Sequence, residues 1–592
     1  MQQDSVLKNI IALWCYLGKK RQLQFTLLLI LMLVTVFAEI ISIGAVIPFL
    51  SALTKPESLM TLTWFEPVIK ILNIQTADEL LLPLTLGFIA ATIFSAGVRI
   101  LLLWANGRLT AAMGIQLSTE IYTRTLYQPY EYHVAHNSSQ LVSMVTQKVG
   151  IAIQVGIMHV LLLVSASIMS IAIITMLLMV NTQVAIIAAV ILGGGYILTG
   201  YLARKRIKHN GDIIAKNQPQ AVKCMQEGLG GIRDIIMDNS QAVFSRLYTQ
   251  VSRDMRTAAM QNSFLSGLPK SLLEMLGITL IAGLAYWLQI NSSGQQAAIP
   301  VLGVLALGAQ RLLPSLQQIY FSWSHINGHH AILAEVTNQL ESVLSSSNTH
   351  HQPFSPMVFR NHISLQHLYF CYAGTDVNVL KDVCLTINKG SRVGFMGTTG
   401  SGKSTLSDII MGLLLPTQGQ LVIDDLVINA NNIGAWQRNI AHVPQNIFLA
   451  DTSMAENIAF GVPIDKIDSV RVKQAAKDAQ ISVFIEGLTD GYQAFVGERG
   501  IRLSGGQRQR IGIARALYKQ ANVIVFDEAT SALDNETEAS VMEAINSLDK
   551  DLTVIIIAHR LSTLKECDVI YQLNQGEIIS SGSYNESIEL SG

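Results

Sequence analysis

Six long apolar runs in the first part of the chain constrain its fold more than any other feature. A helix needs about 20 apolar residues to cross a lipid bilayer, and each run is close to that length or longer. Half of the 592 residues are hydrophobic and only 14% are charged, a balance that favours membrane helices over the buried helices of a soluble core. We therefore predict six transmembrane helices at residues 25–50, 80–104, 151–180, 184–202, 264–290 and 299–326.

The distribution of lysine and arginine predicts the orientation of these helices. Basic residues cluster at Lys19, Lys20 and Arg21, recur between runs two and three, and are densest between runs four and five. The short segments that join runs three and four, and runs five and six, carry no charge. Because cytoplasmic loops hold the excess of basic residues, we place both termini and the long loops in the cytoplasm of a multi-pass inner-membrane protein. Residues 6–17 are expected to form a short interfacial helix.

The net charge and the cysteine content argue against a nucleic-acid partner, a zinc site and a disulfide framework. The net charge of −1 gives no sign of a nucleic-acid partner. The five cysteines are scattered and show no CxxC spacing. We therefore expect reduced thiols, with neither a zinc site nor a disulfide framework.

The character of the chain changes near residue 345. The stretch SSSNTHHQPFSP is polar and contains proline, which indicates a linker. Beyond it, short β-rich runs alternate with amphipathic helices, a pattern typical of an α/β domain. The predicted fold is an α-helical six-span transmembrane domain with long cytoplasmic loops at 1–345, a linker at 346–360 and an α/β P-loop domain at 361–592.

The second domain contains the stretch GTTGSGKST, which matches a phosphate-binding P-loop. Glycines allow backbone N–H groups to turn toward phosphate oxygens at the start of a helix. Lys403 is expected to neutralise the β- and γ-phosphates, and Ser404 to bind Mg²⁺. The stretch comprises Gly397, Thr398, Thr399, Gly400, Ser401, Gly402, Lys403, Ser404 and Thr405.

Two further stretches carry acidic and anion-binding patterns. The apolar run 523–526 is followed by Asp527 and Glu528. At the end of such a strand the first acid can hold Mg²⁺ through water, and the next can polarise an attacking water. The turn Ser504-Gly505-Gly506 precedes a predicted helix, whose N-terminus favours an anion but has no phosphate of its own in the same chain.

Together with LSGGQ, VIVFDEATSALD and TVIIIAHRLST, this P-loop resembles the ATP-binding cassette of ABC transporters. The resemblance covers essentially the whole chain, because six spans followed by one cassette match the exporter-type fused half-transporter. It implies a homodimer with two composite sites for ATP and Mg²⁺. Since no core motif is degenerate, both sites are expected to hydrolyse ATP.

The resemblance also implies roles for single residues. Tyr372 would stack on adenine, and Gln445 would reach Mg²⁺ beside Ser404 and Asp527. Glu528 would be the catalytic base, and His559 would hold the γ-phosphate and water. Two alternatives stay open, namely Tyr372 as an ordinary surface aromatic and His559 as a structural residue. The residues that would cap the γ-phosphate held by the partner's P-loop are Ser504, Gly505, Gly506 and Gln507.

Five charged residues lie inside the predicted spans: Glu39, Arg99, Lys270, Glu274 and Arg311. Charges in membrane segments usually face the bundle interior or a wet cavity. Lys270 and Glu274 are four residues apart on one helix and can neutralise each other, and Glu39 can pair with one arginine. One arginine then remains in each subunit, which favours a positive cavity, whereas internal pairing is the alternative. The candidate substrate residues are Arg99, Lys270 and Arg311.

The membrane stretches EIISIGAVIPFL, VRILLLW and AQRLLPS resemble the exporter branch that includes lipid-linked oligosaccharide flippases and heterocyst-type glycolipid exporters. This resemblance implies ATP-driven export or flipping of an amphipathic or lipid-linked substrate across the membrane. Membrane lipid and that substrate are therefore the expected partners. Arginine suits its phosphate or pyrophosphate group. Export of a peptide, drug or siderophore is the alternative within transport, and a channel or regulator is the alternative outside it. The six spans exclude a soluble ABC ATPase of repair or translation.

Overall fold

The computed structural model divides the chain into two compact units. The membrane unit comprises Met1–Gln128 with Tyr132–Asn348, and the cassette unit comprises Pro129–Glu131 with Thr349–Gly592. The structure describes residues 6–16, 18–54, 77–180, 182–291, 295–346, 355–372, 374–375, 377–527, 542–543, 545, 551–558 and 561–589.

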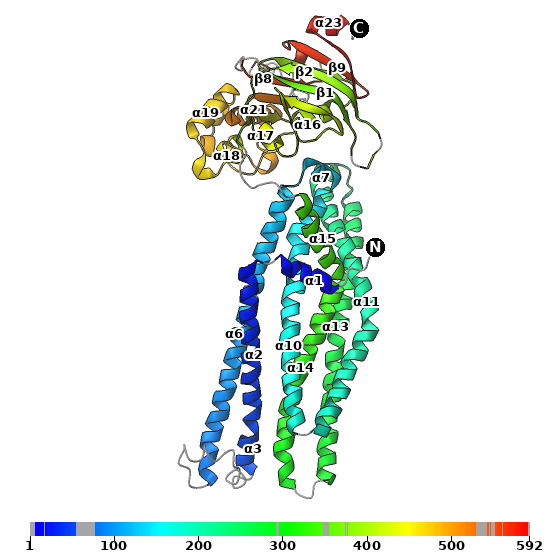
Figure 1. Ribbon diagram of the computed structural model, residues 1–592, viewed down its shortest axis with the longest axis vertical. Helices are drawn as coiled ribbons and strands as arrows, with labels where there is room; N and C mark the ends of the chain where they lie inside the picture. Colours follow the sequence, from blue (N-terminus) through cyan, green and yellow to red (C-terminus); the bar gives the residue numbers. More distant parts are fainter. Residues whose placement is uncertain are drawn as a thin grey trace. The chain divides into compact units, whose positions relative to one another are not determined.

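The membrane unit is a bundle of long helices that run side by side (Figure 1). Among the described residues, π-helical turns at Met144–Lys148 and Gln154–Met158 flank one short helix at the start of the third predicted span, 151–180. The first of these turns precedes that span. A 3₁₀ turn covers Ala77–Leu80. The α-helices are α1 Val6–Cys15, α2 Lys19–Gly44, α3 Val46–Thr54, α6 Leu81–Leu126, α7 Tyr130–Ala135, α8 Ser138–Ser143, α9 Val149–Ile153, α10 His159–Val180, α11 Thr182–Gly230, α12 Ile232–Met237, α13 Gln241–Asn291, α14 Gln295–Gly328 and α15 His330–Ser346.

Three helical stretches of the described residues are long and apolar enough to cross a membrane. They are Lys19–Leu53, Leu81–Leu126 and Ser138–Met179, and they cover the first three predicted spans except for residues 80 and 180. The fourth, fifth and sixth predicted spans lie within α11, α13 and α14. The predicted N-terminal helix is present as α1, with Leu13 buried against the bundle.

Three helices are much longer than the apolar runs that predicted them. Helix α6 has 46 residues, α11 has 49 and α13 has 51, so each measures roughly 70 Å at about 1.5 Å per residue. The hydrocarbon core of a bilayer is only about 30 Å thick. The hydrogen-bond ladder of α11 continues through the polar stretch ARKRIKHN. The apolar runs therefore mark the stretches suited to the bilayer and not the ends of the helices.

The described residues of the cassette unit form two sheets. An antiparallel sheet has the order β2-β1-β4-β5, and a six-stranded sheet has the order β10-β9-β3-β8-β7-β6. In the larger sheet all neighbouring strands are parallel except β10 and β9. The strands are β1 His362–Phe370, β2 Leu380–Asn388, β3 Arg392–Gly397, β4 Gln418–Ile423, β5 Leu426–Val427, β6 Ile440–Val443, β7 Val523–Asp527, β8 Thr553–Ile557, β9 Val569–Asn574 and β10 Glu577–Gly582.

Helices pack against this framework and are short compared with those of the membrane unit (Figure 1). In the described part of this unit, 3₁₀ turns cover Ile464–Lys466, Gly491–Gln493, Glu498–Gly500 and Leu561–Leu564. The α-helices are α16 Lys403–Ile410, α17 Ile433–Gln437, α18 Met454–Ile458, α19 Ser469–Asp478, α20 Ser482–Glu486, α21 Gly505–Lys519 and α23 Tyr584–Glu589.

Strand β7, which lies between β8 and β6, has apolar side chains on both faces. Val523 and Val525 pack in the same cluster as Trp436, whereas Ile524 and Phe526 pack on the other side with Ile511. Strands of parallel sheets are covered on both faces, which is why VIVF reads as a continuous apolar run. A helical membrane domain followed by an α/β domain is the predicted fold class, and it is confirmed.

Candidate functional site

The predicted P-loop joins β3 to α16 and depends on glycine at two positions. Gly397 has φ +153°, and a Cβ there would lie 2.3 Å from the carbonyl oxygen of Leu573. Gly402 has φ +100°, and a Cβ there would lie 2.8 Å from Leu380. Any side chain at either position would force the loop out of this path. Residues Thr398, Thr399 and Gly400 at its tip are exposed.

The loop holds the cation that the sequence predicts for it. Lys403 is buried, and its Nζ donates to the carbonyl oxygens of Gly397 at 2.7 Å and Thr398 at 3.0 Å. The neighbouring Ser404 is exposed. A fixed ammonium in a glycine-rich loop at the start of a helix is suited to bind phosphate oxygens.

Tyr372 follows β1 and reaches the same loop. Its hydroxyl lies 3.1 Å from Thr405 Oγ1, and its ring stands edge-on to Phe370 at a centroid distance of 5.0 Å. The side chain is half-buried, so an aromatic face lies beside the P-loop. Its predicted role in stacking on adenine stays a prediction.

Oxygen-bearing side chains gather at the carboxyl edge of the large sheet. Asp527 ends β7, and Gln445 follows β6, the parallel neighbour of β7, with Val443 paired to Phe526. A hydroxyl from Ser404, an amide oxygen and a carboxylate are the hard ligands that Mg²⁺ prefers.

The turn Ser504-Gly505-Gly506 begins α21 with a reciprocal cap. Ser504 Oγ accepts a hydrogen bond from the backbone N–H of Gln507 at 3.2 Å, and Gln507 Oε1 accepts one from the N–H of Ser504 at 2.9 Å. Ser504 and Gly505 are exposed, and Gly506 is buried. Since the serine hydroxyl uses an acceptor site in this cap, its proton remains able to donate to an anion.

The two predicted catalytic residues, Glu528 and His559, lie outside the described residues. The strands that precede them are described. Strands β7 and β8 are parallel neighbours, with Asp527 paired to Ile557.

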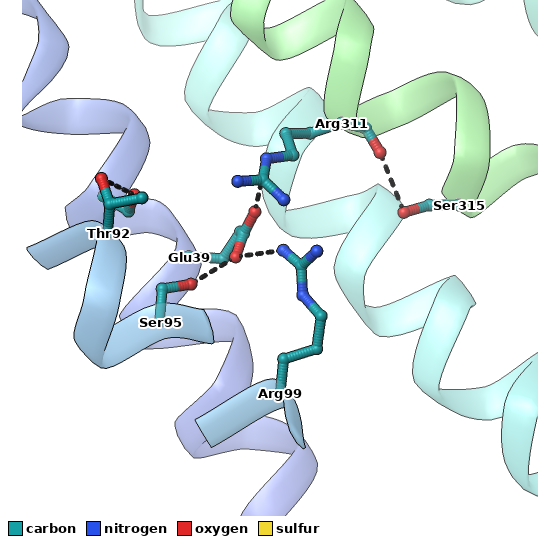
Figure 2. Close-up of polar contacts among 7 residues, drawn as sticks. Glu39, Thr92, Ser95, Arg99, Arg311 and Ser315 are labelled. Atoms are coloured by element: carbon teal, nitrogen blue, oxygen red, sulfur yellow. Dashed lines mark hydrogen bonds and ion pairs between the residues drawn. The ribbon is translucent and has the colours of Figure 1, made fainter. Parts of the chain in front are cut away.

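In the membrane unit, three of the predicted charged residues form one cluster (Figure 2). Arg99 Nη2 on α6 lies 2.6 Å from Glu39 Oε2 on α2, and Arg311 Nε on α14 lies 2.9 Å from Glu39 Oε1. Ser95 on α6 donates to Glu39 Oε2 at 2.5 Å. The Arg311 contact is an ion pair whose N–H is not aligned for a hydrogen bond. We call Glu39, Ser95, Arg99 and Arg311 the charge cluster.

The cluster differs from the sequence prediction in its pairing. The prediction gave Glu39 one arginine and left the other unpaired, whereas the carboxylate contacts both. Glu39 is 1% exposed, while Arg99 and Arg311 are 46% and 33% exposed. Two guanidinium groups and one carboxylate leave a net charge of +1. The partly exposed members of the cluster are therefore the cations.

Three members of the charge cluster, Glu39, Arg99 and Arg311, line a cavity of about 410 Å³ within the membrane unit. Lys270 is exposed and lies outside this lining, and no ion pair with Glu274 is found among the described residues. The structure therefore brings two of the three predicted substrate residues together. Besides Glu39, Arg99 and Arg311, the lining consists of Thr35, Leu102, Leu162, Ser165, Ala166, Met169, Ile173, Gln310, Pro314, Ser315 and Gln318.

Comparison with known families assigns both units. The family model described as ABC transporter matches residues 380–531, and the model described as ABC transporter transmembrane region matches residues 26–307. The chain belongs to the ABC transporter family. The transporter is thus an integral membrane protein with an ATP-binding cassette, and the glycine-lined loop with its buried Lys403 fits the phosphates of ATP.

Full-length relatives support the same architecture. The Heterocyst differentiation ATP-binding protein HepA of Nostoc sp. is 28% identical to the transporter over 571 residues, covering 94% of this chain and 90% of the relative. The ATP-dependent lipid A-core flippase of Chromohalobacter salexigens is 29% identical over 488 residues, which cover 80% of this chain and 81% of the relative. A solved structure of a bacterial Atm1-family ABC exporter with ATP bound has the same fold, with a TM-score of 0.77, 22% identity and 97% of each chain covered.

Sequence reasoning missed two residues of the transporter's candidate sites. Burial, together with the weaker effect of the negative charge of Asp527, raises the pKa of Asp408 on α16 to about 6. Its position four residues after Ser404, one helical turn, was the available signal. Ser95 was missed although it stands one turn before Arg99. A serine in an apolar run is too common to identify without its partner.

Proposed function

We propose that this ABC transporter is a homodimeric, ATP-driven exporter or flippase of a lipid-linked amphipathic substrate with an anionic head group. The class that fits best is a phosphate- or pyrophosphate-linked oligosaccharide lipid. The observation that carries the proposal is the charge cluster, in which two partly exposed arginines share one buried carboxylate beside the cavity. The relatives named lipid A-core flippase support a lipid substrate.

The cavity combines the contacts that such a head group needs. Each guanidinium group can donate two parallel hydrogen bonds to a phosphate, and these charge-assisted bonds are stronger where the dielectric is low. Gln310, Gln318 and Ser165 add neutral hydrogen-bonding groups for sugar hydroxyls. The net charge of +1 in each subunit favours an anion over a cationic drug or siderophore complex.

In the cassette, we propose that ATP is hydrolysed at two composite sites. Lys403 would bind the β- and γ-phosphates, and Tyr372 the adenine. Mg²⁺, held by Ser404, Gln445 and Asp527, would neutralise phosphate charge. The general base would be Glu528, His559 would hold the γ-phosphate and the attacking water, and Ser504 to Gln507 of the partner chain would cap the γ-phosphate.

Reconstitution in proteoliposomes tests the substrate class. The transporter is expected to move a fluorescent polyprenyl phosphate with ATP, and to move a matched polyprenyl alcohol at least tenfold more slowly. Arg311→Gln and Arg99→Gln should each reduce transport of the phosphate while basal ATPase activity persists. Lys270→Gln is the matched control, since that cation lies outside the cavity lining. Equal transport of the phosphate and the alcohol would show that the head group is not recognised, which favours the peptide or drug alternative.

We also propose that the protein lies in a bacterial-type inner membrane with both termini in the cytoplasm, and that its domains span residues 1–345 and 361–592. In a cysteine-free variant, Ser58→Cys, which lies outside the described residues, should react with an impermeant maleimide from outside intact cells. Ser252→Cys on α13 should react only after permeabilisation. The reverse pattern would overturn the orientation.

A further inference from the structure

The cassette unit carries a second cluster of potential ligands on its antiparallel sheet, apart from the nucleotide residues. His367 lies on β1, and Asp382 and Cys384 lie on β2. One ligand atom from each side chain lies within 4.8 Å of the other two. All three residues are exposed, so a metal ion would have direct access from solvent.

We propose that His367, Asp382 and Cys384 bind one Zn²⁺ ion, with water completing a tetrahedral site. Zn²⁺ accepts thiolate, imidazole and carboxylate ligands together, and sites with three protein ligands keep a fourth position for water. We call these three residues the β1–β2 site.

The spacing of the ligand atoms suits this ion. With Zn–S and Zn–N bonds of about 2.3 and 2.05 Å, a tetrahedral site separates sulfur from nitrogen by about 3.6 Å. The distance from Cys384 Sγ to His367 Nδ1 is 3.7 Å. His367 Nδ1 lies 2.8 Å from Asp382 Oδ1, and zinc would separate these two atoms to about 3.4 Å. Exposed side chains can make that adjustment of about 0.6 Å by small rotations.

The three side chains lie at a β-bulge in the β1–β2 pair. The register of β1 and β2 shifts between Leu365 and Leu368, so the β1 segment containing His367 bulges opposite Cys384. His367 has φ 46° and Asp382 has φ 47°. They are two of the eight non-glycine residues with positive φ among the described residues. Such strained positions cluster at functional sites, and here two of them carry the ligands of one site.

The cysteine sulfur also accepts a backbone hydrogen bond. The backbone N–H of His367 donates to Cys384 Sγ at 3.2 Å, and hydrogen bonds to sulfur are typical of metal-bound cysteines. On binding zinc, Cys384 would lose its thiol proton and His367 would carry its proton on Nε2, leaving Nδ1 for the metal. An ordinary exposed ion pair between His367 and Asp382 requires neither the bulge nor the N–H···S contact.

Cobalt titration of the full-length protein tests the proposal. The protein is purified in detergent with a tag that does not bind metal, treated with a chelator and exchanged into ATP-free buffer. Co²⁺ is expected to produce a sulfur-to-cobalt charge-transfer absorption that saturates at one equivalent per chain, and Zn²⁺ should remove it by displacement. Cys384→Ser should abolish the absorption.

His367→Ala and Asp382→Ala should each weaken Zn²⁺ binding by at least about tenfold, the lower end of what loss of an outer-sphere partner costs. Cys371→Ser is the matched control, because this partly exposed thiol is outside the β1–β2 site, and it should leave the absorption unchanged. The proposal is overturned if no charge-transfer absorption forms. It is also overturned if the absorption survives Cys384→Ser, or if His367→Ala and Asp382→Ala bind Zn²⁺ as tightly as the parent.

Discussion

The P-loop of the cassette and the charge cluster of the membrane unit both present cations to an anion, but they are built in different ways. In the P-loop, Lys403 is held by carbonyl groups five and six residues away in the same loop. In the charge cluster, Glu39, Arg99 and Arg311 come from three helices, α2, α6 and α14. The P-loop is therefore a local structure, and the charge cluster exists only when the bundle is packed.

The difference teaches how each site should respond to change. A local loop depends on backbone shape, so it is sensitive to side chains that do not fit. A cluster that joins three helices depends on balanced charge, because a buried carboxylate without its cations is costly. The four predictions below test this contrast, and their expected effects decrease from the first to the last.

The largest effect is expected from Glu528→Gln. A positioned general base contributes about 10²- to 10⁴-fold to a rate, so ATP hydrolysis should fall by that factor while ATP binding persists. Phosphate release by single-turnover assay and binding of a fluorescent ATP analogue measure the two quantities. Lys403→Ala should instead lose binding. Turnover of Glu528→Gln at the parental rate would remove Glu528 from the catalytic role.

The second effect concerns the balance of the charge cluster. The double variant Arg99→Gln with Arg311→Gln leaves Glu39, which is 1% exposed, without a cation. Breaking a buried ion pair in this way typically costs about 3–5 kcal/mol, and the partial exposure of the arginines puts the expected loss of stability at the lower end. Adding Glu39→Gln should restore most of it. Thermal unfolding in detergent measures both changes, and a double variant as stable as the parent would mean that the cluster is not a structural ion pair.

The third effect tests the shape of the P-loop. In Gly397→Ala, the new Cβ would lie 2.3 Å from the carbonyl oxygen of Leu573, so the loop must move and ATP should bind at least tenfold more weakly. Gly461→Ala is the control, because Gly461 also has positive φ, +82°, but faces open space. The folding stability of Gly461→Ala should fall only by the conformational cost of about 1–2 kcal/mol. This variant should bind ATP as the parent does. Equal ATP affinity in the two variants would show that the close approach at Gly397 does not shape the loop.

The smallest effect separates helix capping from phosphate binding. Ser504 and Ser453 form equivalent reciprocal caps, at α21 and α18, so replacing either with alanine should reduce stability by about 1 kcal/mol. Only Ser504→Ala should also reduce ATP hydrolysis, because Ser504 is exposed whereas Ser453 is buried. If both variants hydrolyse ATP equally well, Ser504 acts only as a helix cap.

The cassette could be predicted in detail because its motifs are contiguous in sequence. Each motif reflects a need of the nearby backbone. VIVF forms a strand covered on both faces, the P-loop glycines allow positive φ, and the serine caps the first turn of α21. Such requirements are visible in a stretch of ten residues, and the structure has these elements where the sequence predicts them. Asp408 was missed because its relation to Asp527 crosses from a helix to a strand far away in the chain.

In the membrane unit, the sequence alone determined which segments are apolar enough for a bilayer and which charges they contain, because transfer into hydrocarbon depends on composition. Only the tertiary structure decided that both arginines contact one glutamate and that Lys270 lies apart. Ion pairing depends on which helix faces meet, and apolar side chains pack in many registers. The β1–β2 site shows the same limit. His367 lies 15 residues from Asp382 and 17 from Cys384 across a bulge, so no short spacing in the sequence marks the full ligand set and only strand pairing brings the histidine to the other two.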